Sequence, residues 1–116
     1  QIEKISIEKE SIMGGMSCGE VSLIPWEILK NSVNYCVTVS DEHISKTIKF
    51  LANNQFADEK LIGGECSTPG IISLIGLTND NAIKNKKNLE ENSNILLFGC
   101  EGDADEELYQ KLLNSN

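Results

Sequence analysis

Two glycine-rich loops and the end of one apolar run carry the residues of this chain that could do chemistry. Residues 13–20 hold three glycines in eight positions, which lets the backbone approach a neighbour or a ligand closely. Residues 63–70 place Glu65 between a glycine pair and a cysteine. The third segment is the apolar run 95–98, which is followed by glycines, acids and Cys100.

The surrounding pattern predicts the elements that position these loops. The run 95–98 predicts a buried strand that ends abruptly and turns into a helix, and shorter strands are expected at 5–7 and 35–39. Helices are expected after Ser22, after Ser40, from the pair Thr68 and Pro69, across about 81–89, and from Glu106 onward. This order predicts one α/β domain of three layers, in which helices flank a mostly parallel sheet. Ligands of such sheets bind at the carboxyl ends of the strands.

Each loop also has a plain structural interpretation. Residues 13–20 could form only a tight turn, and Gly63 with Gly64 could do the same while Glu65 caps a helix. A carboxylate between glycines at the start of a buried helix is costly, however, unless it has a partner or a function. His43 is the only histidine and lies beside an apolar helical stripe. It is therefore expected to be a solvated or half-buried helix residue rather than a base.

The charge and the cysteines exclude several classes of function. The formal net charge is -8, and the 10 basic residues are all lysines. Without the bidentate guanidinium of arginine we expect no nucleic-acid partner, and the acidity disfavours a membrane surface. No apolar run approaches the roughly 20 residues of a membrane span, and no apolar signal core is present.

The four scattered cysteines argue against a zinc site and favour free thiols in a reducing cytoplasm. We therefore expect a cytoplasmic protein without a bound metal. Because the first residue is Gln1 rather than methionine, we also expect a fragment or an excised domain.

Three segments of the chain together carry a resemblance that no single glycine motif could. They are residues 13–20 with 26–29 downstream, residues 63–67, and residues 100–105 with Tyr109. In their order and spacing they resemble the C-terminal part of the diaminopropionate ammonia-lyase family, over essentially the whole chain. The resemblance implies a pyridoxal phosphate (PLP) enzyme built like the tryptophan synthase β subunit, with the cofactor between two α/β domains. It also implies α,β-elimination of 2,3-diaminopropionate to pyruvate and ammonia, in a homodimer that acts on a small amino acid.

The resemblance implies roles for individual residues. Gly15 matches the loop glycine near the cofactor ring, and Gly64 and Glu65 match the loop beside the nitrogen edge of the ring. Cys100 falls where the family places a small polar residue, more often threonine, that meets the pyridine nitrogen. A neutral partner there leaves the nitrogen largely unprotonated, which suits elimination better than transamination. Departures from the family pattern are Gly14 for alanine, Gly63 for serine and Ala104 for threonine.

Two parts of the family's site have no counterpart in this sequence. The resemblance implies a lysine that binds the cofactor and a glycine-rich phosphate loop, both in the N-terminal half of the enzyme. Residues 1–116 are therefore expected to be the C-terminal part of a PLP-dependent lyase, without a catalytic residue of their own and inactive alone. Two alternatives stay open. One is a PLP enzyme similar to serine and threonine dehydratases, and the other is a non-catalytic α/β binding module.

Overall fold

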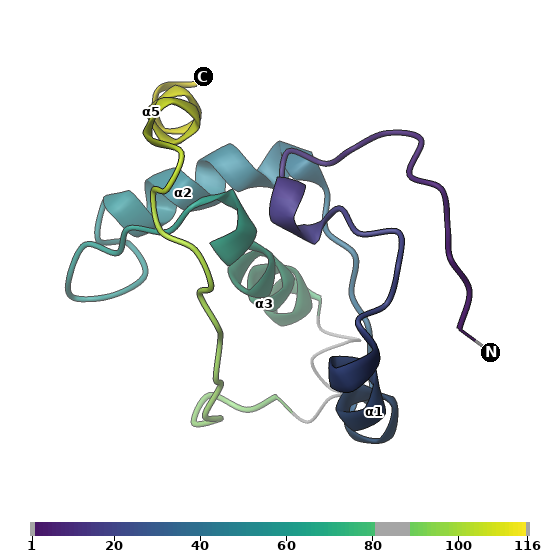
Figure 1. The fold of residues 1–116 in the computed structure, drawn as a ribbon. Helices are drawn as coiled ribbons and strands as arrows, with labels where there is room; N and C mark the ends of the chain where they lie inside the picture. Colours follow the sequence, from purple (N-terminus) through teal and green to yellow (C-terminus); the bar gives the residue numbers. More distant parts are fainter. Residues whose placement is uncertain (1, 81–88, 116) are drawn as a thin grey trace.

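Helices form the framework of the chain (Figure 1). The computed structural model describes residues 2–80 and 89–115. Within them lie the α-helices α1 (Leu23–Ser32), α2 (Ile44–Ala52), α3 (Pro69–Asn79) and α5 (Glu106–Asn114), and the 3₁₀ turns η1 (Gly14–Met16), η2 (Asp41–His43) and η3 (Glu65–Ser67). Both α5 and α3 pack against α2, whereas α1 stands apart from this group (Figure 1).

The core forms on one face of α2, where apolar residues recur at helical spacing. Ile44 and Ile48 are fully buried, and Leu51 one turn further on is 4% exposed. The predicted apolar stripe of this helix is therefore confirmed. Buried residues from other segments complete the cluster around it: Met13, Cys66, Tyr109 and Leu112. Each glycine-rich loop thus contributes one buried side chain to the core, Met13 from the first loop and Cys66 from the second.

Hydrogen bonds fix the start of α5 and its position on α2. The Asp105 carboxylate accepts a hydrogen bond from the backbone N–H of Leu108 at 2.9 Å, which is the usual N-cap arrangement. The Ser45 hydroxyl of α2 donates to the carbonyl of Leu112 at 2.7 Å. The closing helix predicted from Glu106 is confirmed, and the Ser45 bond sets its register against α2.

Asp41 ties the first glycine-rich loop to the start of α2. Its carboxylate accepts hydrogen bonds from the Ser11 hydroxyl at 2.6 Å and from the backbone N–H of Ile12 at 3.0 Å. These two bonds, the Ser11 bond first, lower the pKa of Asp41. The attachment is therefore present at neutral pH, and it weakens when the pH falls through that lowered pKa. The Ser11 hydroxyl oxygen in turn accepts the backbone N–H of Met13 at 3.0 Å, which links Asp41 to a core residue of the first loop.

The expectation of a three-layer α/β domain with a mostly parallel sheet is wrong. None of the residues 2–80 and 89–115 forms a β-strand, and the segments 5–7, 35–39 and 95–98 run without regular structure. Tyr35 is 62% exposed and Phe98 is 80% exposed, although both belonged to predicted strands. A strand needs a neighbour whose backbone groups complete a hydrogen-bond ladder. Apolar patterning predicts which residues can extend, but it does not supply that neighbour.

The remaining helix predictions have mixed outcomes. α1 forms where it was expected after Ser22, but the side chains predicted to be buried are exposed, Ile24 by 82% and Ile28 by 65%. The predicted polar helix across about 81–89 lies almost entirely outside the described residues. Within the described ranges, no helix has the length and apolar character that crossing a membrane requires.

Removing one methyl group from the core of α2 tests the packing. Ile48→Val should lower the free energy of unfolding by about 1 kcal/mol, because the lost methyl leaves a small cavity in a fully buried position. Urea unfolding followed by circular dichroism measures this change. The matched control is Ile24→Val on the exposed face of α1, which should change the free energy by less than about 0.5 kcal/mol. Equal effects of the two substitutions would contradict the assigned core.

Candidate functional site

The second glycine-rich loop meets the turn that follows the apolar run 95–98. The backbone N–H of Gly64 donates to the carbonyl of Glu101 at 3.1 Å. The backbone N–H of Glu101 donates to the Ser67 hydroxyl oxygen at 2.9 Å, and that hydroxyl donates to the Glu101 carbonyl. Two segments far apart in the sequence, both predicted to lie at a ligand site, are thus joined by one backbone bond and by the Ser67 hydroxyl.

Gly64 lacks a side chain because the backbone of the other turn lies where a Cβ would be. A Cβ built on Gly64 would stand 2.2 Å from the carbonyl oxygen of Gly102, well inside the contact distance of real atoms. The backbone dihedral φ of Gly64 is -71°, which any residue can adopt. The glycine is therefore required by close approach of two chain segments and not by an unusual conformation.

Cys66 occupies the centre of the junction. It is 6% exposed, and its backbone N–H donates to the Oε2 atom of Glu101 at 3.1 Å. Burial raises the pKa of the Cys66 thiol, and the hydrogen bond between this thiol and the Glu101 carboxylate raises it further. The thiol is therefore protonated at neutral pH and is a poor nucleophile.

The first loop and Cys100 reach the same place. A Cβ built on Gly15 would lie 3.4 Å from the sulfur of Cys66, so the backbone of the 13–20 loop borders the buried thiol. The thiol of Cys100 donates to the carbonyl of Cys66 at 3.5 Å, while Cys100 itself is exposed. Glu65 is half-buried and adjoins Cys66 in sequence. The structure thus brings together all four residues predicted for the site, and their role in binding stays a prediction.

Glu65, Cys66 and Glu101 form a group that could hold a metal ion, since one ligand atom of each lies within 4.8 Å of the others. Two carboxylates and a thiol are ligands that zinc accepts. The same geometry has an explanation without an ion, because Glu101 already accepts the backbone N–H of Cys66. All four cysteines of the chain are free, as the scattered spacing predicted.

Sequence reasoning missed three residues of this junction: Cys66, Ser67 and Glu101. They stand directly beside residues that were assigned, but nothing in their own spacing says which backbone groups they would meet. Tyr109 is a further buried polar residue, and its hydroxyl has no hydrogen-bond partner among the described residues. Burial and the nearby Asp103 carboxylate raise the pKa of the Tyr109 phenol.

A cavity of about 220 Å³ borders the junction. Apolar side chains such as Ile62, Leu97 and Phe98 line it together with a few small or polar residues, and none of the four residues predicted for the site lines it. Gly63, Ser67 and Glu101 are shared between this cavity and the junction. An apolar wall next to a few polar groups is typical of small-molecule sites.

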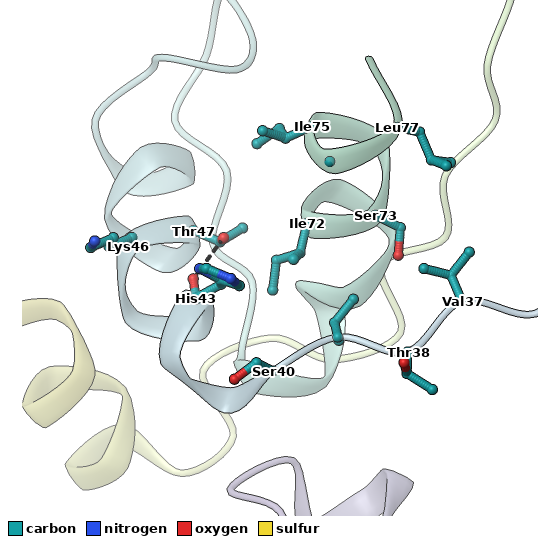
Figure 2. Close-up of a pocket in the computed structure, with 12 residues that line it drawn as sticks. Val37, Thr38, Ser40, His43, Lys46, Thr47, Ile72, Ser73, Ile75 and Leu77 are labelled. Atoms are coloured by element: carbon teal, nitrogen blue, oxygen red, sulfur yellow. Dashed lines mark hydrogen bonds between the residues drawn. The ribbon is translucent and has the colours of Figure 1, made fainter. Parts of the chain in front are cut away.

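A larger cavity of about 620 Å³ lies elsewhere, between α2, α3 and the segment 37–40 (Figure 2). Ile72 of α3 projects into it, and the Thr47 hydroxyl on its α2 side donates to the carbonyl of His43 at 2.9 Å (Figure 2). His43 is exposed at the rim and lies 3.4 Å from the Glu42 carboxylate, in agreement with the predicted solvated position. None of the residues predicted for the site lines this cavity.

Comparison with known proteins finds relatives that match nearly the whole chain, including the three segments that meet at the junction. The chain is similar to diaminopropionate ammonia-lyases. It is 25% identical to the enzyme of Escherichia coli over 115 residues, which cover 97% of this chain and 29% of the relative. It is 26% identical to the enzyme of Salmonella typhimurium over 107 residues, which cover 89% of this chain and 26% of the relative. No protein-family model matches the chain, and no solved structure matches it.

Two alanine substitutions test the close approach at Gly64. Gly64→Ala should separate the two turns, because the added methyl group would overlap the carbonyl of Gly102. We expect a loss of about 1–3 kcal/mol in the free energy of unfolding, the usual cost of overpacking. Gly14→Ala is the matched control, because nothing lies within 4 Å of a Cβ built there. Urea unfolding of both variants measures the difference, and equal stabilities would contradict the described junction.

Proposed function

We propose that this chain belongs to a PLP-dependent ammonia-lyase that eliminates ammonia from 2,3-diaminopropionate and yields pyruvate. The observation that carries the proposal is the similarity to diaminopropionate ammonia-lyases along 97% of the chain. It is supported by geometry that sequence similarity does not require, since Gly15, Gly64, Glu65 and Cys100 gather around Cys66. The chain spans 29% of the length of the Escherichia coli relative, so the activity proposed is that of a complete enzyme.

The residues at the junction fit one edge of the cofactor. A pyridine nitrogen needs a small polar partner, and Cys100 offers an exposed thiol between two residues, Gly99 and Glu101, that line the smaller cavity. Its present hydrogen bond runs to the carbonyl of Cys66 at 3.5 Å, and a thiol is a weak donor. The thiol can therefore exchange that partner for a ligand atom at little cost. We propose that residues 1–116 supply this edge and that the cofactor-binding lysine and the phosphate loop lie outside them.

When bound, PLP supplies the electron sink for the elimination. The residues of this chain would hold the cofactor ring and adjust its electronic properties. By the resemblance, the Cys100 thiol would be a small polar partner at the nitrogen edge, and Glu65 on the 63–67 loop would help to hold the same edge. The backbone at Gly15 would let the first loop approach the cofactor closely.

Two further features complete the proposal. We propose a homodimer for the complete enzyme because the resemblance implies one, and a cytoplasmic location because the scattered cysteines favour free thiols. The substrate is the least constrained feature, since the departures at Gly14, Gly63 and Ala104 lie next to the proposed site. A PLP enzyme acting on serine or threonine, and a non-catalytic binding module, are the outcomes that the assay must separate from the proposed reaction.

The activity assay compares the complete natural polypeptide that carries this sequence with residues 1–116 alone. Each is incubated with PLP and with 2,3-diaminopropionate, serine or threonine, and oxo-acid release is followed with lactate dehydrogenase for pyruvate. We expect pyruvate from diaminopropionate with the complete polypeptide and none from residues 1–116. Preference for serine or threonine would replace the substrate, and silence with all three amino acids would favour the non-catalytic module.

Replacing the proposed nitrogen partner tests the role of Cys100. Cys100→Ala should lower kcat for elimination by about tenfold and shift the absorption band of the bound cofactor, because the ring loses its polar neighbour. Folding should change little, since Cys100 is exposed. Cys36→Ala removes another exposed thiol, far along the chain from the junction, and should leave both measurements unchanged. An unaltered spectrum and rate in Cys100→Ala would remove this residue from the site.

A further inference from the structure

The 3₁₀ turn η3 has no N-cap from its own segment. The residue at its N-cap position is Gly64, which has no side chain to accept a hydrogen bond. Glu101 supplies the missing acceptor from a segment 35 residues away, because its Oε2 atom receives the backbone N–H of Cys66 at 3.1 Å. A carboxylate that caps a turn in this way makes a charge-assisted bond, which is stronger than a neutral one.

Three attachments join η3 to the turn at Glu101, and they depend on different atoms. The bond from Gly64 and the pair of bonds with Ser67 use only the backbone of Glu101. The bonds with Cys66 use the Glu101 carboxylate, and they continue to the buried thiol. A substitution at Glu101 therefore removes the carboxylate contact with Cys66 and leaves in place the bonds with Gly64 and with the Ser67 hydroxyl.

We infer that Glu101 is a positioning residue of the proposed site, which sets the placement of Glu65 and Cys100 relative to each other. Cys100 precedes Glu101, and Glu65 precedes the residue that Glu101 caps, so both site residues are held one position from the contact. The Cys100 thiol reaches across to the carbonyl of Cys66, the same residue. Without the cap, η3 keeps the bonds at Gly64 and at the Ser67 hydroxyl but loses the contact at Cys66.

The negative charge of Glu101 and the position of its acceptor oxygen have different effects on the contact. Glu65 and Glu101 are both acidic, and one carboxylate oxygen of each lies within 4.8 Å of the other. Two like charges at this distance repel, so the charge itself does not draw the loops together. The useful property is the acceptor oxygen at the right place. Glutamine keeps an oxygen acceptor there, whereas alanine removes it and aspartate withdraws it by one methylene group.

The experiment uses the complete natural polypeptide and the variants Glu101→Gln, Glu101→Ala and Glu101→Asp. The control is Glu59→Ala, which removes an exposed carboxylate. Hydrogen–deuterium exchange of the peptide that holds residues 63–68 reports the capped N–H without any cofactor. We expect exchange in Glu101→Ala to be about tenfold faster than in the wild type, because a charged hydrogen bond is lost. Glu101→Gln keeps an acceptor oxygen but loses the charge, so it should exchange at a rate between those of the wild type and Glu101→Ala. The control should exchange at the wild-type rate, and Glu101→Asp should resemble alanine.

A second measurement on the same proteins links the contact to the site, and this part rests on the proposed function. Titration with PLP, followed by its absorption, should give a dissociation constant about tenfold higher for Glu101→Ala and near wild type for Glu101→Gln. Unchanged exchange in Glu101→Ala and Glu101→Asp would overturn the inference. Faster exchange with unchanged PLP affinity would also overturn it, since Glu101 would then hold a loop without positioning the site. If Glu101→Ala does not fold, Glu101→Asp decides both points.

The two proposals fail in different ways. A wild-type polypeptide that neither binds PLP nor releases an oxo acid would overturn the proposed function. The exchange rates would still decide whether the Glu101 carboxylate fixes η3. Retained lyase activity with unchanged exchange in the variants would overturn the positioning role and leave the proposed function standing.

Discussion

Burial of the apolar face of α2 is the interaction on which the other described elements depend. Ile44 and Ile48 lose all contact with water, and residues from α5, η3 and the first glycine-rich loop pack on them. Hydrophobic contact is not directional, so it collects these segments without fixing their register. The directional part comes from hydrogen bonds at the edge of the core, such as Ser45 to Leu112. The candidate site is one of the edges where the two kinds of interaction meet.

The positions of the described helices and the closeness of the site residues were predicted correctly from the sequence, whereas the three-layer arrangement with a sheet was not. α2 was predictable because its apolar residues follow one face and Ser40 caps the 3₁₀ turn η2 that leads into it, and both features are local. The exposed segment 95–98 was interpreted as a buried strand because apolar residues are usually inside, yet burial depends on what lies opposite. Leu97 rests against Gly70 of α3, while Phe98 is exposed. No local pattern distinguishes these two neighbours.

The candidate site was predictable by resemblance and only partly by physics. Gly64 illustrates the difference, because the family pattern assigns it to the cofactor and the structure gives it a second reason, the nearby carbonyl of Gly102. Gly15 has no such steric need, since a Cβ there would make an ordinary contact. Glu101 was not predicted as a site residue, because its role depends on a side-chain oxygen that accepts a backbone N–H 35 residues away. Contacts of that kind exist only after the chain has folded.

The cavity beside the junction argues for a ligand that is mostly apolar with a polar part. Ile62 and Phe98 offer apolar surface, and Phe98 is 80% exposed. The polar residues that line the cavity are Ser67 and Glu101, and the neighbouring Cys66 thiol is held protonated. A strongly anionic ligand would be repelled there by Glu65 and Glu101, which bear like charge. A ring whose phosphate is held elsewhere satisfies both conditions, which is the division of roles proposed for this chain.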